Sequence, residues 1–523
     1  MNAKKISWLN SLVALPLLIT MACDVLSRSF DLSSGLAMRL AEAQRMATGQ
    51  LPYLDFFSLD SNFALYLSGL PLALNQFLYK SFHLFVPLAL LAKSLILSLL
   101  VLSLLVSLLI LRKSANGDLY RYFAICFLLG NYLVRFEFGE LQHLFLLFAL
   151  PFMLARWLNY QSIPVKSWLM VLSALMALCG VLLDPYFLLT WLVFELVLTL
   201  YFGRCAYVSA LVFGALALFG TLVPLFGSKV MVAYQGWILP LRLAKLAVFD
   251  PALLRPGCVP DRRDVILLGV FALMLLFLRI KKQSYLVVPA VLLLMGFGQY
   301  ILECEGLSLT LTWTMACAAF IVLAVLLDTF KSNTRALIVV SLVVSLAGSL
   351  LLYQNSVRQI DAALAAPVDY IKEGLPDIAQ IIDIYSKPRD QVLILSDFAS
   401  TTYPLLNNYD RYQAGYMTYG KPLHLLRMLS EKNKLSPALV QYKKYVEGKF
   451  TQDLLQGKQT LLIVHLNHEL EDMLAIPEVA AIFERNYDML YKCYFYTNRR
   501  EPKEMAGLFY PFYVYMPNHS GAP

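Results

Sequence analysis

Residues 83–111 read HLFVPLALLAKSLILSLLVLSLLVSLLIL, an apolar run that contains one basic residue, Lys93, and no acidic residue. About 20 apolar residues in succession are enough for an α-helix to cross the hydrocarbon core of a bilayer. This stretch and the apolar run 62–79 before it therefore predict helices that span a membrane.

The chain as a whole is also rich in apolar residues. Its 523 residues are 59% apolar and 15% charged, with a mean hydropathy of +0.63, whereas soluble proteins are roughly 45–50% apolar and 25% charged. This composition excludes a soluble enzyme, a disordered chain and a nucleic-acid-binding protein, and it predicts a polytopic α-helical membrane protein. Further apolar runs occupy residues 7–23, 120–134, 141–156, 167–183, 186–203, 205–226, 264–280, 284–303, 307–328 and 334–353.

The distribution of charge predicts which segments lie outside the cytoplasm. Residues 1–355 have a net charge of +9, and their basic residues fall in alternate short loops. Because cytoplasmic loops are enriched in Lys and Arg, loop 24–61, loop 228–262 and everything after residue 353 are expected outside. Segment 62–111 must then cross an odd number of times, although it reads as two spans, 62–79 and 83–111. Either one of these is re-entrant or interfacial, or Lys93 divides the longer one, so the expected total is 11 or 13 spans.

Residues 354–523 differ from the transmembrane part, residues 1–353, because charged residues become frequent and apolar runs become short. Segments 368–385 and 470–485 have helical spacing. This pattern predicts a soluble, extracytoplasmic α/β domain of roughly 160 residues, which is long enough to form its own core. Four short runs predict strands: Gln391–Leu395, Thr460–His465, Tyr491–Tyr496 and Phe512–Tyr515. The eight cysteines form no CxxC pair, so neither a zinc site nor a disulfide framework is indicated.

Loop 24–61 is long and rich in charged residues. Within it, residues 35–48 predict a helix that presents Arg39, Glu42 and Arg45 on one face and small or apolar residues on the other. That pattern is typical of a helix that lies in the membrane interface. The PYLDFF element that follows is expected to hold Asp55 at the outer membrane surface. The simplest interpretation of each single charge is a solvated loop residue, but the charged loop as a whole suits chemistry on a lipid-linked substrate.

Three segments resemble one known superfamily. They are AEAQRMATGQLPYLDFFSLDSN at 41–62, FEFGELQHLFLLFALPFMLAR at 136–156, and LLDPYFLL at 182–189. Their order and spacing are similar to those of GT-C membrane glycosyltransferases, in particular to an uncharacterised bacterial branch. The resemblance implies a GT-C-like fold and inverting transfer of a sugar from a polyprenyl-phosphate donor to an extracytoplasmic acceptor, which is a glycan, a lipid or a protein.

The resemblance also implies roles for individual residues. Asp31 or Asp55 is the expected catalytic base, which takes the proton of the acceptor hydroxyl. A divalent metal bound by Asp31, Asp55 and Glu140 is an alternative, and no other cofactor is indicated. The residues expected to bind the donor phosphate or the substrate are Arg39, Arg45, Arg135, Glu140, His143, Tyr53 and Asp60.

This sequence departs from the superfamily pattern at several positions. Gly35 occupies the place of the first Asp, Leu141 that of an Arg, and Asp184 that of a Lys. Asp184 is also well placed to cap a helix. Three explanations remain open: other basic residues grip the donor, the donor differs, or activity is lost.

Three rival functions remain: a flippase or transporter of lipid-linked sugars, an O-antigen ligase or polymerase, and a non-catalytic scaffold subunit, which these departures favour. In every case the expected partners include the lipid bilayer and exclude nucleic acid. The expected location is the bacterial inner membrane, with residues 354–523 in the periplasm.

Overall fold

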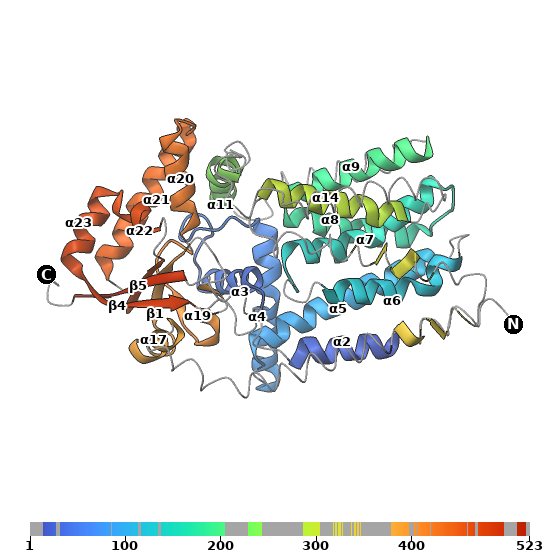
Figure 1. The fold of residues 1–523 in the computed structure, drawn as a ribbon, viewed down its shortest axis with the longest axis horizontal. Helices are drawn as coiled ribbons and strands as arrows, with labels where there is room; N and C mark the ends of the chain where they lie inside the picture. Colours follow the sequence, from blue (N-terminus) through green and yellow to red (C-terminus); the bar gives the residue numbers. More distant parts are fainter. Residues whose placement is uncertain are drawn as a thin grey trace. The chain divides into compact units, whose positions relative to one another are not determined.

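The computed structural model of the chain divides into two compact units, each built from separate segments of the sequence (Figure 1). Unit 1 comprises Met1–Ser29, Ala73–Leu225 and Phe249–Ala363, and unit 2 comprises Phe30–Leu72, Phe226–Val248 and Leu364–Pro523. The structure describes residues 14–27, 32–84, 86–112, 117–133, 138–203, 228–242, 286–303, 317, 320–321, 323–325, 327, 336, 339–340, 342–344, 346, 378–396, 402–403, 405–418, 420–457, 459–465, 469–495 and 510–518.

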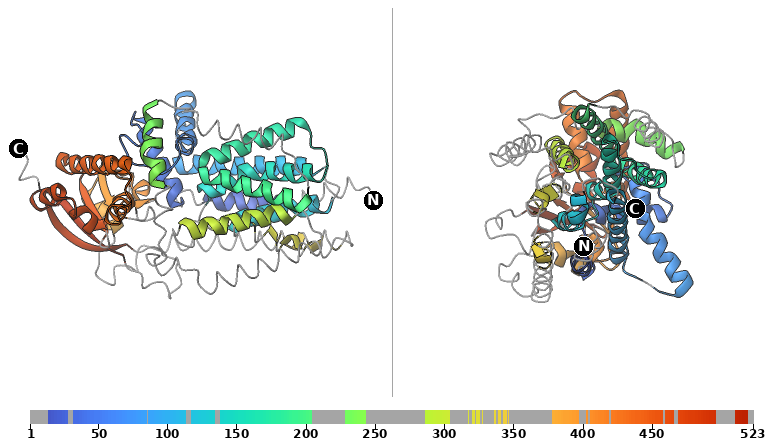
Figure 2. Two further views of the ribbon diagram at one scale, coloured as in Figure 1. Left: turned by 90° about the horizontal axis from the view of Figure 1, so that it is seen from above. Right: turned by 90° about the vertical axis from the view of Figure 1, so that its right-hand side faces the viewer.

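Unit 1 is helical in the parts described. Its helices are α2 (Leu15–Ser27), α5 (Leu88–Leu111), α6 (Gly117–Leu133), α7 (Leu141–Tyr160), α8 (Ser167–Leu183), α9 (Pro185–Phe202) and α14 (Val287–Glu303), and α4 (Asn62–Phe82) reaches it from unit 2. Helices α7 and α8 lie side by side (Figure 2). Gly180 permits this packing, because a Cβ atom there would lie 3.1 Å from the Phe148 side chain and 3.2 Å from that of Phe145.

Two polar features organise α7 and α9. Asp184 is the N-cap of α9, and its Oδ1 accepts a hydrogen bond of 2.9 Å from the Tyr186 amide, which confirms the predicted cap. Further along the same helix, Glu195 accepts hydrogen bonds from the Arg156 guanidinium at 2.7 Å and 2.8 Å. Arg156 is fully buried in α7.

The prediction of a GT-C-like polytopic fold with 11 or 13 spans is wrong. Within the described residues, two helices are long and apolar enough to cross a membrane, Leu88–Leu111 and Leu141–Tyr160. The other apolar helices found are shorter: Leu15–Leu26, Ser167–Leu183, Tyr186–Phe202 and Val287–Gly296. The physical reason is that burial in a helical core favours the same apolar composition as contact with lipid. Two predicted spans, 205–226 and 264–280, lie outside the described residues, as does most of 307–328 and 334–353.

Unit 2 contains a mixed five-stranded sheet in the order β2-β1-β3-β5-β4. The three strands β2, β1 and β3 are parallel neighbours, and β5 and β4 continue the sheet in antiparallel pairing. The strand bounds are β1 Gln391–Leu395, β2 Tyr412–Gln413, β3 Leu461–His465, β4 Tyr487–Phe495 and β5 Tyr510–Pro517. All four strands predicted from the sequence are therefore present, with β2 in addition.

Helices cover both faces of this sheet (Figure 1). On one face, α17 (Ile378–Tyr385) and α19 (Leu405–Asn408) join alternate strand residues such as Ile394, Ile463 and Val514 in a buried core. On the other face lie α20 (Lys421–Glu431), α21 (Pro437–Gln456), α22 (Glu469–Leu474) and α23 (Pro477–Asn486).

Two segments from the N-terminal half of the chain complete unit 2. One contains α3 (Ser34–Ala47) and the loop that follows it, and the other contains α11 (Ser228–Ala233) and a π-helix, η2 (Tyr234–Ile238). Both belong to segments that the sequence places on the same side of a membrane as residues 354–523. The side itself stays a prediction.

Candidate functional site

Helix α3 forms the centre of the site. It begins at Ser33, whose side chain accepts a hydrogen bond from the Leu36 amide, and it matches the predicted helix 35–48. Its surroundings differ from the expectation for a helix in the membrane interface. Arg39 and Glu42, predicted on a solvated face, are 2% and 0% exposed. The rest of unit 2 therefore covers helix α3 on its charged face as well as on its apolar face.

The buried charges of α3 face the loop at residues 58–60. Arg39 forms an ion pair with Asp60, with NH1 and Oδ2 3.7 Å apart. Glu42 accepts a hydrogen bond of 3.1 Å from the Ser58 hydroxyl on its Oε2. In the part of the chain that the structure describes, its other oxygen, Oε1, is buried and has no hydrogen-bond donor. These residues, Arg39, Glu42, Ser58 and Asp60, form what we call the inner cluster.

Burial controls the protonation of Glu42. It raises the pKa of this carboxyl well above its ordinary value, because the charged form loses its hydration, and the negative charge of Asp60 raises it further. The hydrogen bond from Ser58 and the charges of Arg39 and Arg45 oppose the shift without cancelling it. A buried carboxyl with a raised pKa is the kind of group that exchanges protons in enzyme sites.

Asp55 and Arg45 lie nearer the surface, and we call them the outer pair. Asp55 is exposed, and its Oδ2 accepts a hydrogen bond of 2.8 Å from the Leu51 amide, so the carboxylate closes the turn in which it lies. Arg45 donates from NH2 to the Asp55 carbonyl at 3.2 Å and from Nε to Gln50 at 2.6 Å. Among the described residues, no acceptor reaches its buried NH1 atom.

Tyr53 connects the inner cluster to the turn of the outer pair. Its side chain is completely buried, and its hydroxyl donates a 2.6 Å hydrogen bond to the Asp60 carbonyl. Burial raises the pKa of this phenol well above its usual value. Its backbone is held at a φ of +68°, a value that L-residues rarely adopt, so the turn depends on the surrounding contacts.

Those contacts come largely from the α/β part of unit 2. Tyr416 donates from its hydroxyl to the Tyr53 carbonyl at 2.9 Å, and its own carbonyl accepts from the Phe57 amide at 2.8 Å. Thr418 donates to the Phe57 carbonyl at 3.0 Å, and Tyr445 donates to the Leu54 carbonyl at 2.7 Å. The turn that carries Asp55 is thus fixed by hydrogen bonds from residues more than 350 positions away.

The structure brings together five of the residues singled out from the sequence: Arg39, Arg45, Tyr53, Asp55 and Asp60. Asp31 and Arg135 lie outside the described residues. The sequence reasoning missed Glu42 as a site residue, because it assigned this residue to a solvated helix face. The signal available was its position between Arg39 and Arg45, at spacings of three residues.

Glu140 and His143 belong to unit 1. Glu140 is the N-cap residue of α7. His143 is completely buried, with Nδ1 accepting a hydrogen bond from the Gly139 amide at 3.1 Å and Nε2 lying 3.1 Å from Oδ1 of Asn131. An imidazole that accepts at Nδ1 and donates at Nε2 is neutral. The hydrogen bond between His143 and Asn131 therefore joins α7 to α6.

The proposed metal ligands do not form a metal site in the described part of the chain. No group of three or more His, Cys, Asp or Glu side chains suited to a metal ion occurs among the described residues. Asp55 lies in unit 2 and Glu140 in unit 1, while Asp31 lies outside the described residues.

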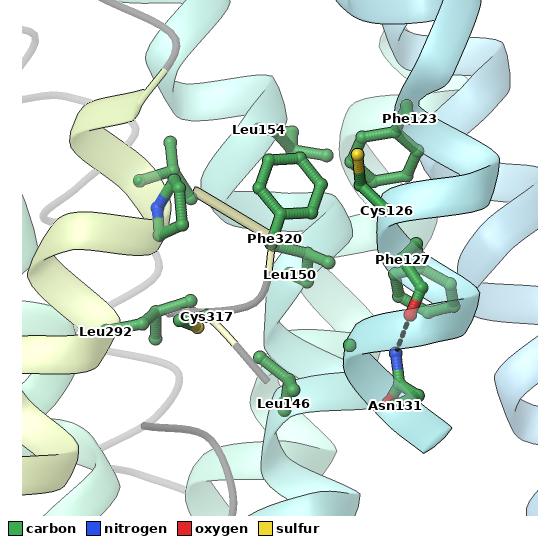
Figure 3. A pocket seen from close by; sticks show the side chains of 13 residues that line it. Phe123, Cys126, Phe127, Asn131, Leu146, Leu150, Leu154, Leu292, Cys317 and Phe320 are labelled. Carbon is green, nitrogen blue, oxygen red and sulfur yellow. Dashed lines mark hydrogen bonds between the residues drawn. The ribbon is translucent and has the colours of Figure 1, made fainter. Parts of the chain in front are cut away.

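An apolar pocket lies in unit 1 (Figure 3). Its walls come from α6, α7 and α14 and include Phe127, Leu150 and Leu292, with the thiols of Cys126 and Cys317. The one polar side chain in its lining, Asn131, donates to the Phe127 carbonyl at 2.8 Å. Such a pocket offers apolar contact but no charged group for chemistry.

In comparison with known proteins, the sequence matches no protein-family model and no curated protein.

Proposed function

We propose that this chain is a membrane-bound glycosyltransferase that transfers a sugar, with inversion, from a polyprenyl-phosphate donor to an extracytoplasmic acceptor. The observation that carries the proposal is the outer pair, an exposed carboxylate next to an arginine on a turn fixed by unit 2. The resemblance of residues 41–62 to the first external loop of GT-C enzymes points to the same turn.

The chemistry of inverting transfer fits these groups. The acceptor oxygen attacks the anomeric carbon while its proton passes to a carboxylate, and the bond from that carbon to the phosphate oxygen breaks. Asp55 supplies the carboxylate, since only its Oδ2 is used by the Leu51 amide and an ionised carboxylate has a second accepting oxygen. Asp31 is the other candidate for this role. Arg45 supplies positive charge for the leaving phosphate.

The inner cluster holds the turn that carries Asp55 in place. Arg39, Asp60 and Glu42 join α3 to the end of the loop, and Tyr53 ties that end to the start of the turn. A site residue that is held by such partners keeps its geometry during the reaction. We therefore assign Glu42 and Asp60 positioning roles, with Asp55 or Asp31 as the base.

The test is transfer of radiolabelled sugar from a panel of polyprenyl-phosphate donors by purified full-length protein in proteoliposomes. Asp55→Asn should reduce the transfer rate by about 10²–10⁴-fold, the range typical of a lost general base. Asp31→Asn is measured in parallel. Full activity in both variants would remove the assignment of the base.

Asp390→Asn is a matched control. The Asp390 carboxylate accepts a 2.8 Å hydrogen bond from the Lys387 amide, as Asp55 does from Leu51, and lies on the connection between α17 and β1. It should keep full transfer activity, which would show that loss of a turn-closing carboxylate elsewhere in unit 2 does not by itself abolish transfer.

A scaffold role is the second candidate, and one observation favours it. The Asp55 carboxylate caps a turn and Asp60 pairs with Arg39, so both acids have structural partners. A scaffold predicts no transfer by the wild-type protein from any donor of the panel, together with lower stability of Asp55→Asn.

A further inference from the structure

The π-helix η2 carries an aromatic residue onto the surface of unit 2 beside the turn of Asp55. π-Helical turns are rare and occur often at functional sites. The ring of Trp237 lies over helix α21, with its centroid 5.2 Å from that of Tyr442 and 4.8 Å from that of Tyr445. The interplanar angles are 22° and 33°, so in this layer of rings Trp237 stacks on Tyr442 and lies tilted against Tyr445.

The layer has a buried floor and a partly open top. Tyr442 is completely buried, whereas Trp237 and Tyr445 are half-buried. Lys449 lies at one edge, with its ammonium 5.7 Å from the centre of the Tyr445 ring. We call Trp237, Tyr445 and Lys449 the aromatic platform.

The platform adjoins the outer pair. Tyr445 donates its hydroxyl to the carbonyl of Leu54, the residue immediately before Asp55. Burial, and after it the negative charge of Asp55, raises the pKa of Tyr445, as expected for a phenol close to a carboxylate. An exposed carboxylate and an ammonium group thus flank a pair of half-buried aromatic rings.

We propose that the aromatic platform binds one sugar ring of a carbohydrate acceptor. The inference rests on the proposed function, and it narrows the acceptor class to a glycan. A sugar has an apolar face of C–H groups and a rim of hydroxyls. Aromatic rings bind the face, while Asp55 and Lys449 bind the rim, the combination of apolar contact and a few placed polar groups that defines ligand sites. Asp55 then has two roles: it binds the rim of the acceptor sugar, and it takes the proton of the acceptor's reacting hydroxyl.

A lipid surface is the other partner that Trp and Lys residues commonly contact. The observations favour the sugar for two reasons. Trp237 lies against two tyrosine rings instead of projecting as an anchor, and the neighbouring Asp55 carboxylate would be repelled by anionic headgroups.

The test uses full-length protein in a detergent without a sugar headgroup, so that the detergent does not compete. The probes are methyl glycosides of common hexoses, N-acetylhexosamines and pentoses. Saturation-transfer NMR reports which sugar protons touch the protein, and titration gives the Kd. For at least one glycoside we expect transfer to the C–H protons of one ring face.

Trp237→Ala should weaken that binding by about tenfold, equivalent to roughly 1.4 kcal/mol, and Trp237→Phe should retain most of it. Trp168→Ala is the matched control, because Trp168 is 54% exposed on α8 of unit 1 and should leave binding unchanged. Circular dichroism establishes that each variant is folded.

The outcomes separate this proposal from the proposed function. Sugar binding that depends on Trp237, without transfer from any donor, supports the platform and counts against the enzyme. Transfer that depends on Asp55, with acceptor use unchanged in Trp237→Ala, supports the enzyme and overturns the platform. Absence of binding for every glycoside also overturns the platform. A parallel measurement of adsorption to anionic vesicles gives the last outcome: if Trp237→Ala reduces adsorption to the vesicles and leaves sugar binding unchanged, the platform is overturned.

Discussion

Both units bury an arginine beside a carboxylate, but they satisfy these groups to different degrees. In unit 1, Arg156 and Glu195 share two hydrogen bonds of 2.7 Å and 2.8 Å, and Tyr160 adds a third to the carboxylate at 2.9 Å. In unit 2, Arg39 and Asp60 are 3.7 Å apart, and Glu42 holds a single bond from Ser58.

The difference separates a structural pair from a candidate functional one. A buried polar atom without a partner costs about 1–3 kcal/mol, and among the described residues Oε1 of Glu42 has no hydrogen-bond donor. The complete pair in unit 1 joins α7 to α9, and both oxygens of its carboxylate accept hydrogen bonds. In the inner cluster of unit 2, Oε1 of Glu42 keeps hydrogen-bonding capacity. This cluster lies beside the turn of Asp55, and that turn is where we place the chemistry.

Breaking the complete pair should have the largest effect on stability. Arg156→Ala leaves the Glu195 carboxylate buried without a counter-charge and should lower the free energy of unfolding by about 3–5 kcal/mol. The double variant Arg156→Met with Glu195→Leu should recover most of that loss. Urea unfolding in detergent, followed by circular dichroism, measures both. Equal stability of the single variant and the wild type would contradict a structural role.

Neutralising the incomplete cluster should change the pH dependence of stability. The pKa of Glu42 is raised in the folded protein above the ordinary 4.5. Folding therefore takes up a proton between these two values, and this group makes the protein less stable as pH rises through that interval. Glu42→Gln removes the effect, so the stability of this variant relative to wild type should increase as the pH rises above about 4.5. A constant difference across this range would show that Glu42 is ionised at an ordinary pKa.

Removing single hydrogen bonds that fix the turn should have an intermediate effect. Thr418→Val leaves the buried Phe57 carbonyl without its 3.0 Å partner, and Tyr416→Phe removes the 2.9 Å bond to Tyr53. Each should cost about 1–3 kcal/mol and should increase proteolysis within residues 50–57. Tyr412→Phe is the control, because that side chain is 41% exposed on the edge strand β2. Unchanged proteolysis would show that the turn holds its shape without these bonds.

Helix caps should give the smallest effects, and similar ones in both units. Asp184→Ala in unit 1 and Ser33→Ala in unit 2 should each cost about 1 kcal/mol. Asp184→Asn should be close to wild type, because Asn caps helices as well as Asp does. Thermal unfolding checks both, and a loss in Asp184→Asn as large as in Asp184→Ala would indicate that its charge matters beyond the cap.

Local structure in unit 2 followed from the sequence. The strand Gln391–Leu395 was predicted with its observed bounds, and the helix over 35–48 is present as Ser34–Ala47. Both depend on short-range patterns, a β-branched apolar run for the strand and capping with helical periodicity for the helix. Segment 470–485 had helical spacing but forms two helices, because Pro477 starts the second one.

Features that depend on distant residues did not follow from the sequence. The burial of Arg39 and Glu42 is created by the α/β part of the chain, and no local pattern reveals it. The length of helix α7 was equally hidden. The apolar run ended at residue 156 by composition, yet α7 continues to Tyr160, because Arg156 finds its partner on another helix.

Unit 2 is assembled from segments that leave the ribosome far apart in time. Helix α3 is synthesised before residues 378–518, which supply the strands and the hydrogen bonds that enclose it. Its charged face must remain hydrated until the sheet has formed, because burying Glu42 earlier would leave it with fewer partners. Contacts across more than 350 residues form slowly, so maturation of this site is expected to be a late step in biogenesis.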